Sequence, residues 1–429
     1  NHGDFGQSRP VPMGHFCMST GRITVIGGGI IGLSIAAVLQ RDGMQVTLLE
    51  AKHIGAGASF GNAGHLATEQ VYPVADPAVF KHLPRMLLDP LGPLRIDWRY
   101  LPSLLPWITQ LAWNMRPSAF ETIHQALMKL NQACLPAWNH LVQDFGLQQW
   151  VHVQGSFLVC EKPASVQGLQ QHGSKLNGLG VNNTWVDAAA LQAREPALNN
   201  NQLGGLFFPD TGHVTDLMGV LQKLATEFQQ TGGEIIENCA VLHAKQQGQQ
   251  VVLNTTQGDK VVDKVVVATG AHSKALVAEL TGCLVPLDTE RGYHYMLPQE
   301  KNRLNLPVSS ADRRFIMTPM DGGLRLAGTV EYAGLQAAPN MERARQLLQV
   351  ANPMLKQGLN SEGATEWMGF RPTIVDSLPV IDRFGSVFLA FGHQHLGLTQ
   401  AAVTAESMRS LLRHEAPALD LHPYRLNRF

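Results

Sequence analysis

Apolar positions at the start of the chain form two short runs on either side of a helix-length stretch. Ile23–Ile26 is typical of a buried strand, and the small and apolar residues of Ile30–Gln40 predict a helix. Gln45–Glu50 then predicts a second strand. The order of these three segments predicts that the fold opens with a βαβ unit.

Both periodicities recur later, so the expected fold class is α/β with a mixed α+β part. Helices are predicted over Ala119–Phe145, Met218–Thr231, Met341–Leu355 and Leu396–Leu412. Strands are predicted over Val151–Glu161, Val265–Gly270, Tyr293–Leu297, Phe315–Thr318, Leu324–Thr329 and Val387–Phe391, with several short ones between Glu234 and Val267. Prolines interrupt the segment from Val79 to Trp113, which predicts short helical pieces there.

The composition is that of an enzyme-sized globular protein. A chain of 429 residues with 45% hydrophobic positions can bury a large core, and its length suggests roughly two or three domains. The 33 basic and 34 acidic residues nearly cancel, without a long block of like charge. Nucleic acid is therefore not an expected partner, and a small molecule is. No uninterrupted apolar run is long enough to span a bilayer.

Cysteine usage and the first residues bear on the compartment. The five cysteines are scattered and include no CxxC pair, so no zinc site or redox dithiol and no other metal site is expected. A reducing cytoplasm fits this usage best. Residues 1–20 lack the charged start and apolar stretch of a secretory signal, and we interpret them as a leader or a remnant of cloning.

A glycine-rich segment joins the first strand to the first helix. Gly27, Gly29 and Gly32 satisfy the pattern GxGxxG, and Glu50 follows at the end of the second strand. These glycines permit a tight turn, a close approach of backbone N–H groups to a pyrophosphate, and close packing of helix on strand. Glu50 can accept hydrogen bonds from both ribose hydroxyls, which argues against NADP. The pattern predicts a dinucleotide site.

Further motifs extend over most of the chain. They are Gly55–Gly64, Gly212–Asp216, Ala268–Gly270, Arg291–Tyr293, Gly369–Pro372 with Asp376 and Pro379, and Gly392–Gly397. With these motifs, from Ile23 to the last helix, the chain resembles the FAD-dependent D-amino-acid oxidase and dehydrogenase superfamily. The resemblance is closest to the bacterial D-amino-acid dehydrogenase branch, including the proline-rich stretch before Trp107.

The resemblance implies FAD as the cofactor, bound by a discontinuous, glutathione-reductase-like Rossmann domain over 21–80, 205–285 and 365–429. A mixed-sheet substrate domain over 81–204 and 286–364 is implied beside it. Gly392–Gly397 can aim the N-terminus of the last helix at the flavin, where positive dipole raises the reduction potential; a plain helix cap is the alternative. The implied cofactor contacts are Gly27, Gly29, Ile31, Gly32, Glu50, Ser59, Asn62, Ala63, Gly64, Gly270, Gly392, Leu396, Gly397, Leu398 and Thr399.

The resemblance also implies residues for the substrate. In similar oxidases the arginine of the GxRP motif, here Arg371, holds the substrate carboxylate, and a guanidinium suits this because it forms two parallel charged hydrogen bonds. The alternative is a structural ion pair with Asp376. Some relatives carry a tyrosine where this chain has Phe315, which leaves Tyr293, or His294 beside it, as alternatives for a second contact. His395 is a further candidate for facing the substrate, and a cap is its alternative.

Two weaker signals concern His65 and the tryptophans. His65 directly follows the flavin loop, so covalent flavin attachment through it is a minor alternative. Trp98, Trp107 and Trp113 could form a membrane-surface patch. The prolines and charges around them spoil a clean amphipathic helix, which favours packing inside the substrate domain.

The expected function is FAD-dependent oxidation of the CH–NH bond of a small amino acid, with a D-amino acid favoured. Hydride passes to flavin N5, the imino acid hydrolyses to an oxo acid, and the electrons go to oxygen or a respiratory acceptor. Alternatives are a secondary amine (sarcosine, proline or hydroxyproline) as substrate, or an FAD-binding subunit of a multi-subunit amine or opine oxidase. The expected location is the cytoplasm, with peripheral contact at the inner membrane left open.

Overall fold

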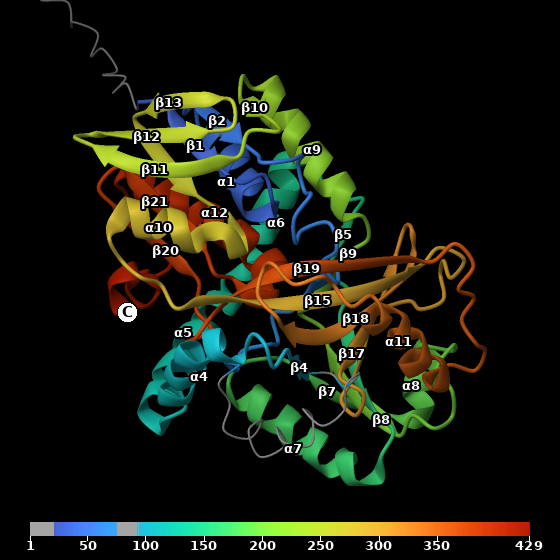
Figure 1. The fold of residues 1–429 in the computed structure, drawn as a ribbon. Helices are drawn as coiled ribbons and strands as arrows, with labels where there is room; N and C mark the ends of the chain where they lie inside the picture. Colours follow the sequence, from blue (N-terminus) through green and yellow to red (C-terminus); the bar gives the residue numbers. More distant parts are fainter. Residues whose placement is uncertain (1–20, 75–91, 93) are drawn as a thin grey trace, which may run out of the picture.

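The computed structural model describes residues 21–74, 92 and 94–429. The expected leader at 1–20 and the prolines Pro84, Pro90 and Pro93 lie outside these described residues. Two large β-sheets organise the described chain, one in the upper part of the view in Figure 1 and one in the lower part.

The first sheet has the order β10-β2-β1-β14-β21-β20, and its strands are parallel except for β20. Its strands are β1 (Ile23–Ile26), β2 (Val46–Leu49), β10 (Glu234–Ile236), β14 (Lys264–Val267), β20 (Val380–Phe384) and β21 (Val387–Phe391). β1 lies between β2 and β14 and is buried on both faces, which explains its unbroken apolar run. The predicted βαβ opening is present, with α1 at Ile30–Arg41.

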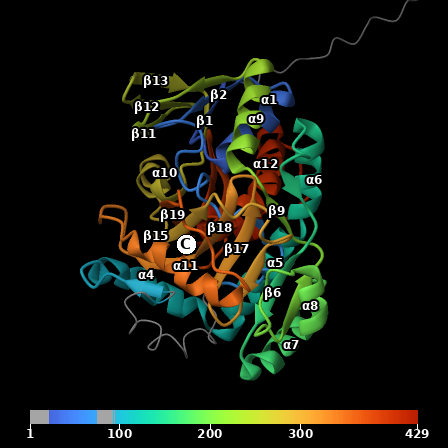
Figure 2. The same cartoon turned by 90° about the vertical axis from the view of Figure 1, so that its right-hand side faces the viewer.

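Helices cover one face of this sheet, and a three-stranded meander lies on the other (Figures 1 and 2). The covering helices are α1, α6 (Cys134–Phe145), α9 (Leu217–Gln230) and α12 (Gly397–Arg413). The meander is β11 (Val241–Gln247), β12 (Gln250–Thr255) and β13 (Gly258–Val262), and α10 (Ser273–Thr281) lies beside it. The doubly covered sheet is of the Rossmann type that the glycine pattern predicts.

The second sheet is mixed, with the order β19-β15-β18-β17-β16-β6-β8-β7, and β4 pairs with β18. Its strands are β4 (Leu94–Ile96), β6 (Ser156–Cys160), β7 (Thr184–Asp187), β8 (Gly204–Phe208), β15 (Leu287–Leu297), β16 (Val308–Ser310), β17 (Phe315–Met320), β18 (Gly323–Tyr332) and β19 (Thr365–Ile374). A small sheet of β3 (His65–Leu66), β9 (Gly212–Val214) and β5 (Val151–His152) is separate. The mixed sheet is therefore the larger of the two.

The remaining helices surround the mixed sheet and the junction of the two sheets (Figure 2). They are α4 (Leu101–Asn114), α5 (Pro117–Gln132), α7 (Pro163–Gly178), α8 (Ala188–Arg194) and α11 (Glu342–Ala351). Short 3₁₀ turns lie at Gly270–His272, Asn352–Met354, Gln394–Leu396, His422–Tyr424 and Leu426–Arg428. In the part of the chain that the structure describes, no helix combines the length and the apolar character that crossing a membrane requires.

Several predicted elements differ in their bounds. The single helix predicted over Ala119–Phe145 is two helices that meet at Ala133, and α4 continues through Pro106 as one helix. Pro106 lies inside α4, where its missing N–H removes one intrahelical hydrogen bond without ending the helix. The helix predicted to Leu355 ends at Ala351, because Pro353 follows in a 3₁₀ turn.

Two strands that fall in the expected cofactor domain pair with the mixed sheet instead. β8 and β19 both lie in the mixed sheet, whereas residues 205–208 and 365–374 were assigned by resemblance to the cofactor domain. β19 contains Gly369 and Pro372, residues that weaken a strand prediction from sequence alone. Its antiparallel pairing with the long strand β15 outweighs that local preference.

Candidate active site

The turn between β1 and α1 has no room for side chains. Gly27 has φ +108, and a Cβ there would lie 2.4 Å from the carbonyl oxygen of Ala268. A Cβ on Gly32 would lie 1.9 Å from the carbonyl oxygen of Gly27. The glycines thereby permit a close approach of the backbone at the start of α1, as pyrophosphate binding requires.

Glu50 and Ser59 lie against this turn. The Glu50 carboxylate accepts hydrogen bonds from the backbone N–H of Gly28 at 2.7 Å and of Lys52 at 2.9 Å. The Ser59 hydroxyl accepts one from the N–H of Ile30 at 2.9 Å. These bonds fix both side chains beside the first turn of α1, where a dinucleotide's ribose and phosphates would lie.

Two further turns leave the same edge of the sheet. Gly270, with φ +56, follows β14, and a Cβ added there would meet no atom within 4 Å. Gly392, with φ +83, follows β21, and a Cβ there would lie 2.1 Å from Ile374. Because β1, β2, β14 and β21 are parallel, all four carboxyl ends meet at one edge, where ligands bind in open α/β sheets. An edge formed by these glycine turns fits a dinucleotide.

The loop at residues 59–64 leads from this edge to the mixed sheet. A Cβ on Gly61 would lie 2.1 Å from the Trp367 ring, and one on Gly64, with φ +75, 2.9 Å from the carbonyl oxygen of Val214. The Asn62 side chain accepts a hydrogen bond from the N–H of Gly64 at 2.9 Å. The loop therefore lies directly on neighbouring elements, and only glycine fits at its contact points.

The N-terminus of α12 is tied to the residues after that loop. Thr399 accepts a hydrogen bond from the N–H of Ala67 through its hydroxyl at 2.9 Å. The indole N–H of Trp138 donates to the carbonyl oxygens of Leu398 and Thr399. Leu396 is buried, and Gly397 begins the helix. These contacts hold the helix N-terminus beside the cofactor edge.

Arg371 lies in β19, opposite Glu290 of β15. Its guanidinium covers Gly292, where a Cβ would lie 2.6 Å from Cζ, and Nη1 donates to the carbonyl oxygen of Thr329 at 3.4 Å. Burial lowers the pKa of Arg371, and the nearby Glu290 opposes this shift. Tyr332 donates to Glu290 at 2.8 Å.

The ion-pair alternative for Arg371 is wrong. Asp376 pairs with Arg428 instead, at 2.6 Å, and accepts a hydrogen bond from the N–H of Leu378. No carboxylate among residues 21–74 and 94–429 forms an ion pair with Arg371. Arg371 is partly buried, so its charge has lost part of its hydration, and a substrate carboxylate would satisfy it.

His395 lies close to Arg371. Burial, together with the charge of Arg371, lowers the pKa of His395 to about 4, and Glu69 opposes this shift. Its Nε2 lies 2.6 Å from the side-chain oxygen of Gln70. His395 is therefore neutral near pH 7, and Gln70 fixes its ring.

Tyr293 lies on the other face of β15. Its hydroxyl donates to Glu331 at 2.6 Å and accepts from the N–H of Asn340 at 3.1 Å, in the region that α11 covers. Phe315 packs in the core cluster with Phe157 and Met317. The structure therefore brings neither aromatic side chain to Arg371.

His294, the next residue along β15, faces the loop at 59–64. Its Nδ1 lies 2.9 Å from the carbonyl oxygen of Gly61, and its ring stacks on Trp367 with centroids 5.0 Å apart. Burial, with the charge of Arg325, lowers the pKa of His294 to about 3. The neutral ring is part of the surface beneath the loop.

His65 has contacts for both ring nitrogens. Nδ1 lies 3.1 Å from the carbonyl oxygen of Gly212, and Nε2 lies 3.0 Å from the Glu69 carboxylate. Burial lowers the pKa of His65, but Glu69 outweighs this effect and raises it. Covalent flavin attachment through His65 stays an untested alternative, and these contacts account for the ring without it.

The sequence patterns missed Glu290, Arg325, Tyr332 and Trp367. All four lie on strands that face the site, and their positions depend on the register of β15 with β18 and β19. A shift in the β15–β18 register between Tyr293 and His294 changes which residues face the loop. Trp367, two residues before Gly369, carried a usable signal, since a bulky residue beside a strand glycine often fills its space.

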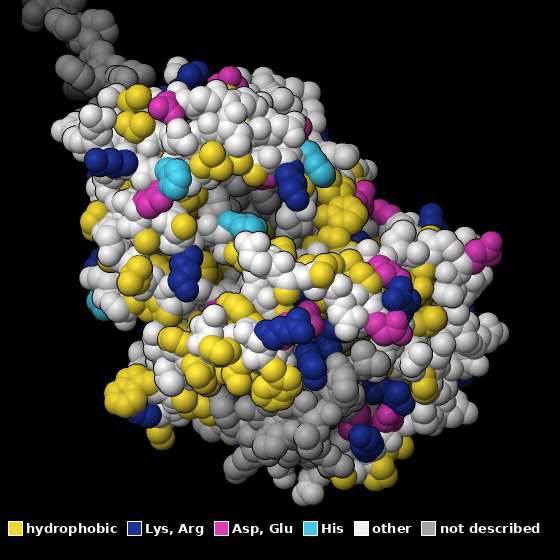
Figure 3. Space-filling model, viewed as in Figure 1, with side chains coloured by type: hydrophobic (Ala, Val, Ile, Leu, Met, Phe, Trp, Pro, Cys, Tyr) yellow, Lys and Arg dark blue, Asp and Glu magenta, His cyan; other side chains and the backbone are white. Residues whose placement is uncertain are grey.

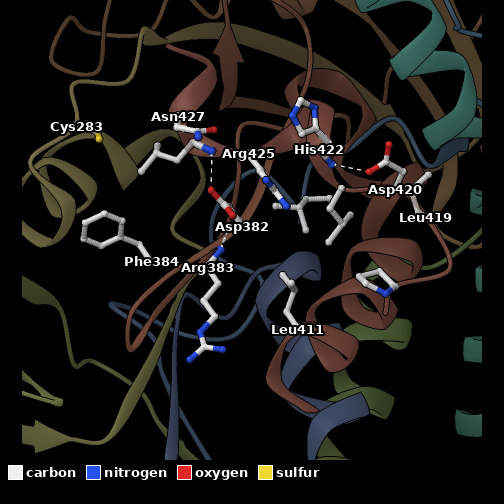
Figure 4. A pocket seen from close by; sticks show the side chains of 14 residues that line it. Cys283, Asp382, Arg383, Phe384, Leu411, Leu419, Asp420, His422, Arg425 and Asn427 are labelled. Carbon is white, nitrogen blue, oxygen red and sulfur yellow. Dashed lines mark hydrogen bonds between the residues drawn. The ribbon is translucent and has the colours of Figure 1, made fainter. Parts of the chain in front are cut away.

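A cavity of about 650 Å³ lies away from this site, between β20 and the C-terminal segment. Figure 4 shows Asp382 pointing at the backbone of that segment, where it accepts from the N–H of Leu426 at 2.8 Å. Its lining also includes Arg383 and His422 but no residue of the glycine turns and not Arg371. It is a gap beside the C-terminal segment, and the chemistry belongs to the junction of the two sheets, where the surface in Figure 3 is hollowed.

The tryptophans near α4 have different surroundings. Trp107 is buried and packs on Tyr332, with ring centroids 5.5 Å apart. Trp98 and Trp113 are 58% and 63% exposed, and Leu105 is also exposed. Hydrophobic side chains gather over α4 at the lower left of Figure 3. Packing explains Trp107, whereas Trp98 and Trp113 remain at the surface.

The glycine edge, the loop on the mixed sheet and the partly buried Arg371 define a flavin-dependent oxidoreductase. A model of the FAD dependent oxidoreductase (DAO) family matches residues 22–411. The chain therefore belongs to this family, among its amino-acid oxidases and dehydrogenases. The expected fold class, the FAD cofactor and the enzyme class are confirmed.

Individual relatives agree with this placement. The chain is 32% identical to a D-amino-acid oxidase of Bradyrhizobium diazoefficiens, over 96% of this chain and 100% of that protein. It is 28% identical to a D-amino acid dehydrogenase of Vibrio vulnificus, over 94% of this chain and 99% of that protein. Among solved structures, a glycine oxidase from Geobacillus kaustophilus superposes with a TM-score of 0.71 at 21% identity, covering 95% of this chain and 99% of that one. This structural likeness supports the fold.

Proposed function

We propose that this enzyme oxidises the CH–NH bond of a small amino acid, with a D-amino acid favoured. The observation that carries the proposal is Arg371. Its guanidinium is partly buried at the mixed sheet and has no carboxylate ion-pair partner among the described residues. A substrate carboxylate supplies the missing charge and two parallel hydrogen bonds. The names of the relatives from Bradyrhizobium and Vibrio support the D-amino acid.

Protein groups orient the substrate in this proposal. Arg371 binds the carboxylate over Gly292, which directs the Cα–H toward the loop at 59–64. FAD held by the glycine edge and this loop would supply the hydride-accepting chemistry. Neutral His395, fixed by Gln70, bounds the pocket beside Arg371 without adding a second positive charge. The substrate amine is oxidised in its neutral form, and no protein base is required.

A secondary amine such as sarcosine or proline stays the alternative substrate, because Arg371 would hold its carboxylate in the same way. A panel of D-, L- and N-substituted amino acids separates these readings when each is mixed anaerobically with the enzyme. Bleaching of the oxidised flavin by D-amino acids supports the proposal. Bleaching by N-substituted amino acids alone would instead support oxidation of a secondary amine. No bleaching by any member would favour a subunit that needs partners.

We further propose that the electrons pass to an acceptor at a membrane and that the α4 surface makes the contact. Trp98, Leu105 and Trp113 are each exposed, on α4 or just before it, and Arg116 stacks on Trp113 with Cζ 3.5 Å from the ring. Exposed tryptophan beside arginine is the combination that settles at the interface of an anionic membrane.

Vesicle sedimentation tests the membrane contact. Replacing Trp113 by Ser should weaken binding to vesicles of phosphatidylglycerol and phosphatidylcholine by roughly 10- to 150-fold, since burying a large apolar side chain contributes about 1.5–3 kcal/mol. Val261→Ser is the control, because Val261 is equally exposed, at 61%, but lies on the meander strand β13. Equal binding by both variants, or no binding by the wild type, would count against the contact.

A further inference from the structure

Three consecutive carbonyl groups of the flavin loop are bound by the mixed sheet beneath it. Nη1 of Arg325, in β18, donates to the carbonyl oxygen of Asn62 at 2.6 Å and to that of Phe60 at 3.3 Å. Nδ1 of His294, in β15, lies 2.9 Å from the carbonyl oxygen of Gly61 between them. Two side chains from neighbouring strands therefore hold the loop from one side.

The direction of these carbonyls fixes the direction of the amides. In a planar trans peptide the N–H points opposite to the C=O of the same unit. The N–H groups that follow the Phe60 and Asn62 carbonyls belong to Gly61 and Ala63. Among the described residues neither N–H has a hydrogen-bond partner. Both amides are therefore turned away from the sheet and left available as donors.

Arg325 is itself a buried charge. Its side chain is almost fully buried, with 8% exposure, and its Nε has no hydrogen-bond partner among the described residues. Burial lowers the pKa of Arg325 to about 10, and Asp216 opposes this shift, so the guanidinium stays protonated at neutral pH. Thr318 lies directly opposite on β17, also buried. The loop thus rests on a fixed cation.

We propose that Arg325 is a positioning residue for FAD. It holds the loop so that the Gly61 and Ala63 amides face the flavin, and its buried charge favours the reduced, anionic ring. A cation in a low-dielectric setting acts strongly on a charge that develops nearby. The proposal rests on FAD binding, which family membership establishes, and is independent of which amine is the substrate.

The test compares Arg325→Gln with Arg325→Lys in two measurements made without substrate. The first is the dissociation constant of FAD, from titration of the apoprotein. The second is the midpoint potential of the bound flavin, from equilibration with redox dyes. Arg345→Gln is the control, because Arg345 is an exposed arginine of the same domain whose partners are Glu342 and Glu366.

Arg325→Gln should bind FAD about tenfold more weakly, since charge-assisted hydrogen bonds are lost. It should also lose about tenfold in the preference for reduced over oxidised FAD, which corresponds to a potential about 30 mV lower. Arg325→Lys should keep the potential of the wild type, because the charge remains. It should bind FAD more weakly, because lysine cannot replace the guanidinium's hydrogen bonds to the loop. Arg345→Gln should change neither quantity.

Two results would overturn the proposal. One is an unchanged potential and an unchanged FAD affinity in a folded Arg325→Gln. The other is an equal fall of the potential in the Lys and Gln variants, which would assign the effect to packing and not to charge. If Arg325→Gln fails to fold, the Lys variant decides: wild-type potential with weakened FAD binding supports the proposal, and a lowered potential rejects it.

Discussion

The cofactor edge and the Arg371 region meet at one junction, but they are assembled in different ways. The edge is made of turns that follow four parallel strands, and its critical atoms are backbone atoms of these turns, such as those of Gly27 against Ala268 and Gly28 against Glu50. The Arg371 region draws on β15, β18 and β19 and on His395 and Gln70, which come from opposite ends of the chain. One region depends on local backbone conformation, the other on strand register.

The consequence is a difference in what each region tolerates. At the edge the critical atoms are backbone atoms, so replacing a glycine by any residue with a Cβ should disturb FAD binding. In the Arg371 region the critical atoms belong to side chains, and a change of one side chain can remove substrate binding while the cofactor stays. Substitutions in the two regions should therefore separate loss of FAD from loss of substrate.

The largest effect is expected at Gly32. In Gly32→Ala the added Cβ would lie 1.9 Å from the carbonyl oxygen of Gly27, and the α1 turn must move. The variant should be purified without flavin, as its absorbance spectrum will show. Gly57→Ala is the matched control, since a Cβ at Gly57 meets no atom within 4 Å and yellow protein is expected. If Gly32→Ala retains stoichiometric FAD, the glycine edge is not the FAD-binding site.

The next effect is expected at Arg371. Arg371→Lys keeps the charge but loses the bidentate fork, so it should retain FAD and lower kcat/KM for the best amino acid. The loss should be about 100-fold, corresponding to about 3 kcal/mol for charge-assisted hydrogen bonds. Steady-state kinetics and the flavin spectrum of the same sample check both parts. A variant that also loses its flavin would mean that the two regions are not separable.

The smallest effect is a pH dependence of stability. Burial lowers the pKa values of His213 and His395 to about 4 and of His294 and His393 to about 3. The unfolded chain therefore binds more protons at these four positions below its ordinary histidine pKa of about 6.5, and their contribution to stability falls as the pH drops from there toward 4. His65 and Glu195, whose pKa values are raised, contribute in the opposite direction.

Urea unfolding at pH 7 and pH 5 measures this fall. His393→Gln should make the difference between the two values smaller, because it removes one buried histidine. His422→Gln, at an exposed position, should leave the difference unchanged. The same difference between pH 7 and pH 5 in His393→Gln and in the wild type would show that the His393 ring accepts a proton in the folded state.

The same contrast explains how far the sequence could be interpreted. Gly27, Gly32 and Glu50 were predictable because their roles follow from a short spacing between a strand and a helix. Arg371 came from resemblance, and its strand β19 was missed. The facing of Tyr293 and His294 was not predictable, because a register shift between these two residues decides it. Arg325 had no sequence signal, since its role depends on a loop more than 260 residues earlier, at Phe60 and Asn62.

The central claim is that an amino acid is oxidised at the flavin while Arg371 holds its carboxylate. The most direct measurement is the anaerobic rate of flavin bleaching with a D-amino acid and with the amine that lacks only the carboxylate. The account predicts bleaching by the amino acid at a rate roughly 100-fold higher at equal, low concentration, from about 3 kcal/mol of lost binding. Equal rates with the two compounds, or bleaching by the amine alone, would contradict it.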